Sequence, residues 1–510
     1  MAIMRKLTYT IVSLCLLIMA GGCIGDDGNY VYTAPEEFNP VKISGIEQEY
    51  QRESRVDFSI EPVVDGLKEH EKYSFTWYVF STAQVSGSKR DTIGREKMLS
   101  WNVPLKTGEY QLVFVVKNET TQVETIAKSI LNVNSGVSRG WYVLKDNGEA
   151  SDLDIIGFDG VVKADVYSSV NGRKLPGKGV QIASQSSYGY EVPKEDGSMS
   201  TKNEAVMIFL TDQDADICDA DKLEEVVSFQ DMFVVAPETK SPQALFYGPA
   251  CFFFVNAGKI YNAYAMTPPP HKLGYYTTGT YHIQGNDILA GSSACLMFDN
   301  ISRSLIIDKG PSNASPVIGF GKHRPEVNPY DCNNMDCELV YMAGRTPKSA
   351  KEGIGIFNKS GDYYIAELDK SFESYQNPII SWTPVAAGKE ITKSGLFAIN
   401  ANAGNKYIYF VDQNGQIKSY SIHDGVEREQ IQTIPVGEKV AFMEHLIYKG
   451  YQDEQYHINC FVVLTNSQEG WKLYTYPFVG ETGDIVDEPL LKGQGKGYGR
   501  HVFYRSKRSL

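Results

Sequence analysis

The sequence predicts an all-β protein in two parts, a small N-terminal β-sandwich followed by a larger β-propeller. Two observations lead to this prediction. Apolar and polar residues alternate along short segments, which is the period of half-buried strands. From residue 136 onward, an apolar run that ends in an Asn, Asp or Gly turn recurs seven times, as expected for propeller blades. Of the 510 residues, 42% are hydrophobic and 22% charged, so most of the chain can bury a core.

Residues 39–135 carry the pattern of one sandwich. The segments 73–79 and 110–116 alternate as half-buried strands, and about 95 residues with frequent turns suit an immunoglobulin-like sandwich. We expect Trp77 to lie in its core. Tyr-x-Phe-x-Trp at 73–77 and Gly-x-Tyr-x-Leu-x-Phe-x-Val-x-Asn at 108–118 resemble the polycystic-kidney-disease (PKD) variety of this fold, with Asn118 where that family often has Asp.

Residues 136–510 carry the repeat. Its seven copies begin at Trp141, Val206, Cys251, Cys295, Gly355, Tyr407 and Cys460. Flanking segments predict inner strands at 339–342, 396–399 and 440–443, and outer strands at 380–385 and 431–436. Four short strands per roughly 50 residues, seven times over, predict a seven-bladed propeller. The alternative is a series of β-sandwiches.

The C-terminal run at 501–504 resembles an inner strand that has no blade of its own. The first copy of the repeat, at Trp141, has no inner strand before it. We therefore predict that the C-terminal strand completes the first blade and closes the ring.

The N-terminus reads as a secretory leader. Residues 1–22 have a basic start, an apolar run and small residues before Cys23. Cys23 in this position resembles the lipidated Cys of bacterial lipoproteins, although Ala20 stands where Leu is commoner. An acidic pair follows, which resembles a surface-export signal of Bacteroidetes-type lipoproteins, and residues 23–38 read as a polar tether. The alternative is a plain secretory signal with an incidental Cys.

Charge excludes some partners. The net charge is −13, which argues against nucleic acid. After the leader, no apolar stretch has the length of a membrane helix. We expect a protein tethered to the outer membrane by lipid and facing the cell exterior, and we predict no cofactor.

Two cysteines stand close together. Cys332 and Cys337 could close a small loop as a disulfide in an oxidising compartment. A metal site there would lack a second pair of ligands.

An acidic run is a weak calcium candidate. Asp212, Asp214 and Asp216 stand at alternate positions, as in a calcium loop. Ile217 and Leu223 occupy the places where such a loop needs Gly and Glu. We favour an acidic turn whose last Asp residues cap a helix around 222–232.

Tyrosines are the better binding candidates. Tyr188 and Tyr190 lie in a Ser/Gly-rich segment, and Tyr275, Tyr276 and Tyr281 follow three prolines. Exposed Tyr side chains on loops can stack on sugars or pack on peptides. The alternative is that they pack between blades.

No catalytic motif is present in the sequence. The histidines form no pair at metal-ligand spacing, and no Gly-x-Ser-x-Gly elbow occurs. Alternating glycines at 493, 495, 497 and 499 read as a flexible loop, because no Lys-Ser/Thr pair follows them. We predict no catalytic residue and a protein that is not an enzyme.

The order of parts resembles a known family. Cys23, the acidic tether, the PKD-like domain and Gly-Trp-Tyr-Val-Leu-Lys-Asp at 140–146 are similar to the Bacteroidetes-type PKD-like surface lipoproteins. That resemblance implies an accessory protein of a SusC/SusD-type TonB-dependent importer, which binds glycans or peptides or acts as a scaffold. It carries over no catalytic residue. The alternatives are a propeller-fold surface hydrolase or lyase acting on glycans or peptides, and an adhesin.

Overall fold

The computed structural model divides the chain into two units, Met1–Val133 and Asn134–Leu510, which we describe separately. The first unit ends two residues before the predicted boundary at 135. The structure describes residues 40–53, 56–82, 90–105, 108–194, 196–247, 250–264, 269–285, 288–292, 294–310, 316–344, 352–401, 407–448, 457–479 and 483–506. The leader, Cys23 and the tether lie outside these residues.

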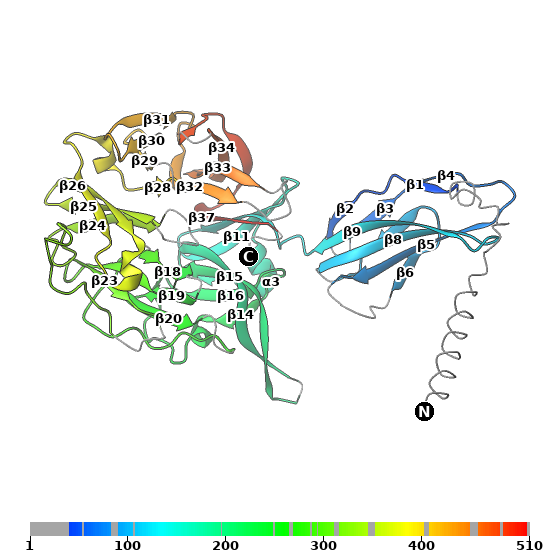
Figure 1. The fold of residues 1–510 in the computed structure, drawn as a ribbon, viewed down its shortest axis with the longest axis horizontal. Coiled ribbons are helices and arrows are strands. Elements are labelled where there is room, and N and C mark those ends of the chain that lie inside the picture. Colours follow the sequence, from blue (N-terminus) through cyan, green and yellow to red (C-terminus); the bar gives the residue numbers. More distant parts are fainter. Residues whose placement is uncertain are drawn as a thin grey trace, which may run out of the picture. The chain divides into compact units, whose positions relative to one another are not determined.

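The first unit is a β-sandwich of antiparallel strands (Figure 1). A five-stranded sheet has the order β2-β9-β8-β5-β6, and two pairs, β1–β4 and β3–β7, complete the unit. The strands are β1 (Lys42–Ser44), β2 (Glu49–Glu53), β3 (Asp57–Ile60), β4 (Val63–Asp65), β5 (Tyr73–Ser81), β6 (Asp91–Gly94), β7 (Leu99–Asn102), β8 (Gly108–Asn118) and β9 (Glu124–Asn134).

The core of the sandwich forms around Trp77, as the alternation predicts. Trp77 is fully buried and its ring stacks on Phe114 with centroids 4.4 Å apart. Its indole Nε1 donates a hydrogen bond to the backbone oxygen of Glu96 at 3.2 Å, so the one polar atom of the ring is satisfied.

The second unit is a seven-bladed β-propeller. Its described residues form seven antiparallel sheets, which Figure 1 shows arranged around a ring. Blade 1 comprises β37 (Tyr498–Arg505), β10 (Gly140–Asp146), β11 (Ala150–Ile156), β12 (Val162–Lys163) and β13 (Leu175–Pro176). Blade 2 comprises β14 (Gly179–Pro193), β15 (Met199–Thr211), β16 (Ala215–Asp219) and β17 (Glu225–Ser228). Blade 3 comprises β18 (Pro242–Tyr247), β19 (Cys251–Asn256) and β20 (Lys259–Tyr264), and blade 4 comprises β21 (Ile288–Ala290), β22 (Cys295–Asp299) and β23 (Ser304–Asp308).

The remaining three blades follow in chain order. Blade 5 comprises β24 (Glu338–Gly344), β25 (Glu352–Lys359), β26 (Asp362–Asp369) and β27 (Ile379–Pro384). Blade 6 comprises β28 (Phe397–Ile399), β29 (Tyr407–Val411), β30 (Ile417–Ser421) and β31 (Glu427–Ile431). Blade 7 comprises β32 (Lys439–Tyr448), β33 (Ile458–Ser467), β34 (Gly470–Val479), β35 (Asp484–Ile485) and β36 (Leu490–Gly495). Short helices connect some strands: α3 (Val166–Asn171), η1 (Phe229–Met232), η2 (Lys370–Ser374) and η3 (Glu390–Lys393). None of the described helices is long and apolar enough to span a bilayer.

The C-terminal strand closes the ring, as predicted. β37 pairs with β10 in an antiparallel ladder from Gly140 opposite Arg505 to Asp146 opposite Tyr498. β37 is therefore the inner strand of blade 1. The first strands of most neighbouring blades contact one another, for example β37 with β14, β14 with β18, and β32 with β37. These inner strands surround the axis of the propeller.

The seven predicted copies of the repeat are the second strands of the seven blades, from β10 to β33. A second strand is covered on both faces by neighbouring blades, which explains its continuous apolar run. The inner strands predicted at 339–342, 396–399 and 440–443 are β24, β28 and β32. The outer strand predicted at 380–385 is β27, whereas the one predicted at 431–436 lies earlier in the chain, as β31.

The glycine-rich loop predicted at 493–499 is wrong, because most of it lies in β36 and β37. Gly493 and Gly495 belong to β36, which pairs with β34. A methyl group on Gly495 would lie 2.6 Å from Nε1 of Trp471 and 2.7 Å from Oδ2 of Asp154. One on Gly499 would lie 2.8 Å from a methyl carbon of Leu464. Glycine is required here because blade 7 packs closely on blade 1.

Candidate functional site

Tyr275 and Tyr276 are the exposed members of the predicted tyrosine set, at 71% and 44% exposure. They lie beyond β20 on a segment that borders this strand. Gly274 N donates to Asn262 O at 3.2 Å, and Thr277 N donates to Ile260 O at 2.8 Å. The segment thus occupies the outer edge of blade 3, and the two rings stand on a frame fixed by the backbone.

A second segment lies beside this one. Leu273 N donates to Met232 O, and Val234 N donates to Leu273 O, both at 2.8 Å. Val234 and Val235 follow Phe233, the residue after η1, and are 64% and 50% exposed. We call Val234, Val235, Tyr275 and Tyr276 the blade-3 patch. Sequence reasoning missed its two valines, because nothing distinguishes an exposed Val-Val pair from a buried one without the fold.

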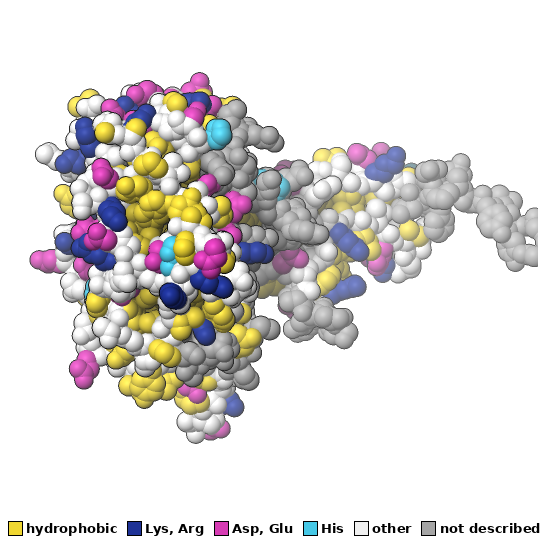
Figure 2. Space-filling view, turned by 60° about the vertical axis from the view of Figure 1, so that its left-hand side comes forward, with side chains coloured by type: hydrophobic (Ala, Val, Ile, Leu, Met, Phe, Trp, Pro, Cys, Tyr) yellow, Lys and Arg dark blue, Asp and Glu magenta, His cyan; other side chains and the backbone are white. Residues whose placement is uncertain are grey.

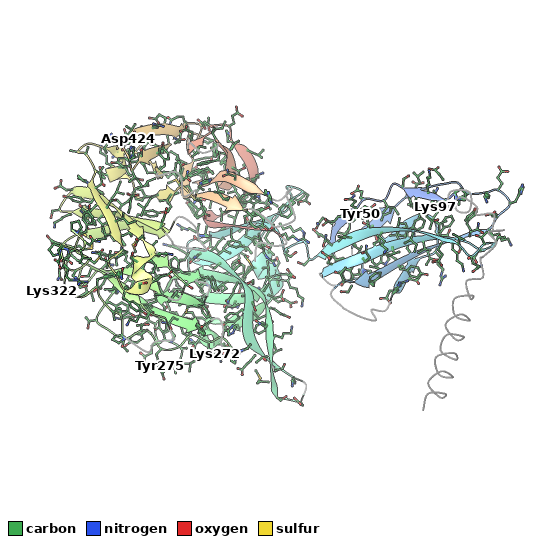
Figure 3. All side chains as sticks on the ribbon, in the orientation of Figure 1. Tyr50, Lys97, Lys272, Tyr275, Lys322 and Asp424 are labelled. Carbon is green, nitrogen blue, oxygen red and sulfur yellow. The ribbon has the colours of Figure 1, made fainter. Side chains whose placement is uncertain are left out.

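Lysines border the blade-3 patch. Lys259 Nζ lies 5.8 Å from the centroid of the Tyr276 ring and donates to the backbone oxygen of Tyr281 at 2.7 Å. Figure 3 places Lys272 and Tyr275 on the same outer edge of the propeller. Lys272 Nζ lies 4.0 Å from a carboxylate oxygen of Glu191. An apolar patch with a charged border is typical of a binding surface.

Beside the patch, β14 and β15 extend as a long hairpin that projects from the ring (Figure 1). The hairpin is fastened to the segment that precedes the patch. His271 N donates to Gly189 O at 2.8 Å, and Gly189 N donates to His271 Nδ1 at 3.0 Å. A methyl group on Gly189 would lie 2.4 Å from Pro269. The absence of a side chain at Gly189 therefore lets the hairpin and the segment meet.

Three of the five predicted binding tyrosines are not available to a ligand. Tyr188, Tyr190 and Tyr281 are exposed by only 2%, 5% and 1%. The Tyr188 hydroxyl donates to His271 O at 2.7 Å, and the Tyr190 hydroxyl donates to Glu204 at 2.8 Å. These rings pack inside the propeller, which was the alternative reading of the sequence.

The acidic run does not form a calcium site. Asp212 accepts a hydrogen bond from the backbone nitrogen of Lys178, Asp214 pairs with Lys240 at 3.1 Å, and Asp216 accepts from Tyr167 and Arg173. The three carboxylates therefore face different partners. No group of three His, Cys, Asp or Glu among the described residues could hold a metal ion.

The helix predicted around 222–232 is also wrong. β17 and the short η1 occupy most of this stretch, because β17 pairs with β16 as the outer strand of blade 2. Asp219 does cap a turn, since its Oδ1 accepts from the backbone nitrogens of Asp221 and Lys222.

Cys332 and Cys337 are separate thiols in this structure, not a disulfide. Both are buried in the apolar cluster between blades 4 and 5. The Cys332 thiol donates a hydrogen bond to Asn377 Oδ1 at 3.0 Å. Burial raises the pKa of Cys337 to about 11, and it raises the pKa of Cys332 as well. Both thiols therefore stay protonated and pack as small apolar groups.

Buried carboxylates elsewhere are held by donors. Burial raises the pKa of Asp216 to about 6, despite the hydrogen bond from Tyr167. Burial also raises the pKa of Asp308, which accepts hydrogen bonds from Thr277 and Asn262, both at 2.8 Å. Asp216 of blade 2 thereby binds Tyr167 of α3, and Asp308 of blade 4 binds residues of blade 3. The geometry assigns them to the architecture of the propeller.

Side chains of the propeller surface are mixed, with hydrophobic groups gathered in patches among charged ones (Figure 2). The blade-3 patch stands out because four exposed apolar side chains share one hydrogen-bonded frame. Its chemistry is contact and stacking, since Val and Tyr side chains supply apolar area and two hydroxyls.

Comparisons with known proteins give distant structural similarities and one family match. No curated protein matches the sequence. A quinoprotein alcohol dehydrogenase-like protein from Bacteroides thetaiotaomicron is similar in structure at 12% identity and a TM-score of 0.41, over 90% of this chain and 96% of that one. YCF48 from Cyanidioschyzon merolae is similar at 11% identity and a TM-score of 0.35, over 66% and 98%. A DUF4784 family protein from Bacteroides caccae is similar at 9% identity and a TM-score of 0.29, over 77% and 95%.

One family model matches the sequence itself. The PKD-like family matches residues 23–179, which include the sandwich and strands β10 to β13 of blade 1 and end at the first residue of β14. The match begins at Cys23. The protein therefore carries a PKD-like region at its N-terminus and continues as a seven-bladed β-propeller.

Proposed function

We propose that this protein is a lipid-anchored surface protein that acts as a non-catalytic binding subunit of a SusC/SusD-type importer of glycans or peptides. The leader and Cys23 supply the anchor on this view. The sandwich serves as a spacer, and the propeller presents a surface to the importer. The PKD-like match over residues 23–179 supports the proposal, since it includes both the anchor and the spacer.

The observation that carries the proposal is the blade-3 patch. Tyr275 and Val234 are exposed by 71% and 64% on a frame of backbone hydrogen bonds. Apolar side chains held rigidly at a surface lose little conformational freedom on binding, so they favour association with another protein. We therefore assign the patch to contact with the importer.

A non-catalytic role is supported by the buried acids. Asp154, Asp216 and Asp308 have raised pKa values, which is often a property of catalytic groups. Each of them accepts hydrogen bonds from neighbouring side chains that hold blades together. These contacts engage at least one oxygen of each carboxylate in structure.

A pull-down from native outer membrane tests the proposal. The full chain with a C-terminal tag is solubilised in mild detergent, and we expect a TonB-dependent barrel and its lid lipoprotein to co-purify. The double variant Tyr275→Ser/Tyr276→Ser should lose at least about tenfold of this recovery. Tyr498→Ser is the matched control, because Tyr498 is 54% exposed on blade 1. Recovery of the wild type alone, where other importers stay intact, overturns the proposal.

The anchor is tested separately. Cys23→Ser should move the protein from the membrane fraction to the soluble fraction and abolish labelling with a fatty-acid analogue. A variant that stays in the membrane would contradict lipidation at Cys23.

A further inference from the structure

Glu444 lies in the middle of β32, the inner strand of blade 7. It pairs in register with Val462 of β33. Val462 belongs to the apolar cluster between blades 7 and 1, together with Phe442 and Leu446 on either side of Glu444. Glu444 is therefore a carboxylic acid on the apolar side of an inner strand.

The other blades have apolar residues at this position. In every blade, two residues near the end of the second strand, separated by one residue, pack against the next blade. The inner-strand residue that pairs with the first of these two occupies the position equivalent to Glu444. The equivalents of Glu444 are Phe503, Ala183, Phe246, Leu289, Ala343 and Ala398. A carboxyl group at the seventh position is not needed to build a blade.

No side chain that the structure describes donates a hydrogen bond or forms an ion pair with Glu444. The nearby titratable groups do not compensate it. Lys492 of β36 and Glu444 both act on the pKa of the Cys460 thiol, but no ion pair among the described residues joins them. Burial lowers the pKa of His501 to about 4, so this imidazole is neutral near pH 7. Its Nδ1 accepts from the backbone nitrogen of Ile182 at 3.4 Å.

The surroundings are aromatic. The rings of Phe442 and His501 lie 4.8 Å apart, and those of Tyr448 and Tyr504 lie 5.8 Å apart. Glu444 itself is only partly buried. Because β32 borders the axis of the ring, we place the solvent-accessible part of this side chain toward the axis. A ligand that enters along the axis would meet this carboxylate and the aromatic side chains on the same face of β32.

We propose that Glu444 binds the ammonium or guanidinium group of a ligand, namely a lysine or arginine side chain of a peptide. This inference rests on the proposed binding function and names its cargo as peptide. A carboxylate that is partly removed from water is stabilised by an opposite charge, which a neutral sugar hydroxyl does not supply. The neighbouring rings would cover the aliphatic stem of the ligand, and an aromatic face also attracts a cation.

Two further observations support this choice. The net charge of the protein is −13, so its field attracts cations. Burial raises the pKa of Glu444 to about 7, and no counter-charge among the described residues offsets this burial. By contrast, the buried Asp154 has Lys145 at 2.7 Å.

Calorimetric titration of the full chain in mild detergent at pH 8 tests the inference. The probes are N-acetyl-Gly-Lys-Gly-amide, its arginine counterpart, the same peptide with norleucine, and a neutral glucose heptasaccharide. We expect saturable binding of the two basic peptides only. Glu444→Gln should weaken that binding by about tenfold or more. Glu488→Gln, at an exposed acid of the same blade, should leave it unchanged.

Other outcomes overturn the inference. Equal binding of basic peptides to the wild type and Glu444→Gln would show that the carboxylate is not the anchor. Binding of norleucine peptide or heptasaccharide as tight as that of the basic peptides would exclude selection by charge. Circular dichroism establishes that the variants are folded. The importer pull-down is independent: Glu444→Gln should still recover the barrel, so failure of one proposal leaves the other standing.

Discussion

The seam between blades 7 and 1 and the outer edge of blade 3 differ in how far their side chains are buried. At the seam, glycines let strands approach closely, and Trp471 Nε1 donates to Asp154 Oδ2 at 2.9 Å in a buried site. At the outer edge of blade 3, Val234 and Tyr275 face solvent. The comparison teaches that the protein packs its side chains closely where the ring must stay closed, and leaves apolar area exposed at the outer edge of blade 3.

The seam should break most severely when its central charge is removed. Asp154→Asn leaves the Lys145 ammonium, which is nearly buried, with only the half-exposed Asp165 as a counter-charge at 3.1 Å. Loss of one partner of a buried pair is expected to lower the free energy of unfolding by about 3 kcal/mol. Urea denaturation followed by tryptophan fluorescence measures it.

Asp165→Asn is the matched control, because it alters the same lysine from an exposed position. Its cost should stay below about 1 kcal/mol. Equal costs for the two variants would contradict the view that burial of Asp154 holds the seam.

A single methyl group tests the close packing. Gly495→Ala places a carbon 2.6 Å from Trp471, in a site where neither neighbour can move freely. Overpacking of this kind should lower the free energy of unfolding by roughly 1–3 kcal/mol. Gly395→Ala is the control, since no atom lies within 4 Å of its added carbon. A thermal melt of both variants compares them, and equal midpoints would refute the steric argument.

Glu444, on the apolar face of β32, should make the free energy of unfolding depend on pH. Burial raises the pKa of Glu444 from 4.5 to about 7, so the folded state holds this proton more tightly than the unfolded state. The contribution of Glu444 is therefore present below about pH 4.5 and is lost as the pH rises to about 7. Glu444→Gln should match the wild type at pH 4.5 and exceed it by roughly 2–3 kcal/mol at pH 8. Urea titrations at both pH values measure this, and a difference that is constant with pH would contradict it.

Two tyrosines sharpen the contrast at blade 3. The Tyr281 hydroxyl accepts from Ile260 N at 3.2 Å and donates to Thr277 O at 2.7 Å, both in buried positions. Tyr281→Phe leaves these groups unpaired and should cost about 1–2 kcal/mol. Tyr275→Phe removes an exposed hydroxyl and should change stability by less than about 0.5 kcal/mol. Thermal melts of both variants compare their stabilities. A larger loss of stability for Tyr275→Phe than for Tyr281→Phe would refute the assignment of Tyr281 to the core and Tyr275 to the surface.

The blades could be predicted because second strands carry a strong signal. Residues 251–256 and 460–466 are apolar along most of their length, since neighbouring blades cover both faces. The missing inner strand of blade 1 could be matched to the C-terminal run by counting. Gly495 could not be interpreted this way, because its reason is the proximity of Trp471 in another strand.

The candidate site was less predictable. Tyr188 and Tyr275 look alike in sequence, yet one is buried under His271 and the other faces solvent. The difference arises where the hairpin of blade 2 meets the segment of blade 3, and such a contact leaves no local pattern. Glu444 is equally silent in sequence, since its meaning depends on the six apolar residues that occupy the same position in other blades.

The pairing of β37 with β10 has a mechanical consequence. The chain enters the propeller at Gly140, in a strand held between β11 and β37. Tension applied through the N-terminal unit therefore loads two ladders at once, because neither edge of β10 is free. In a force experiment, removal of β37 should lower the force at which β10 separates from the propeller.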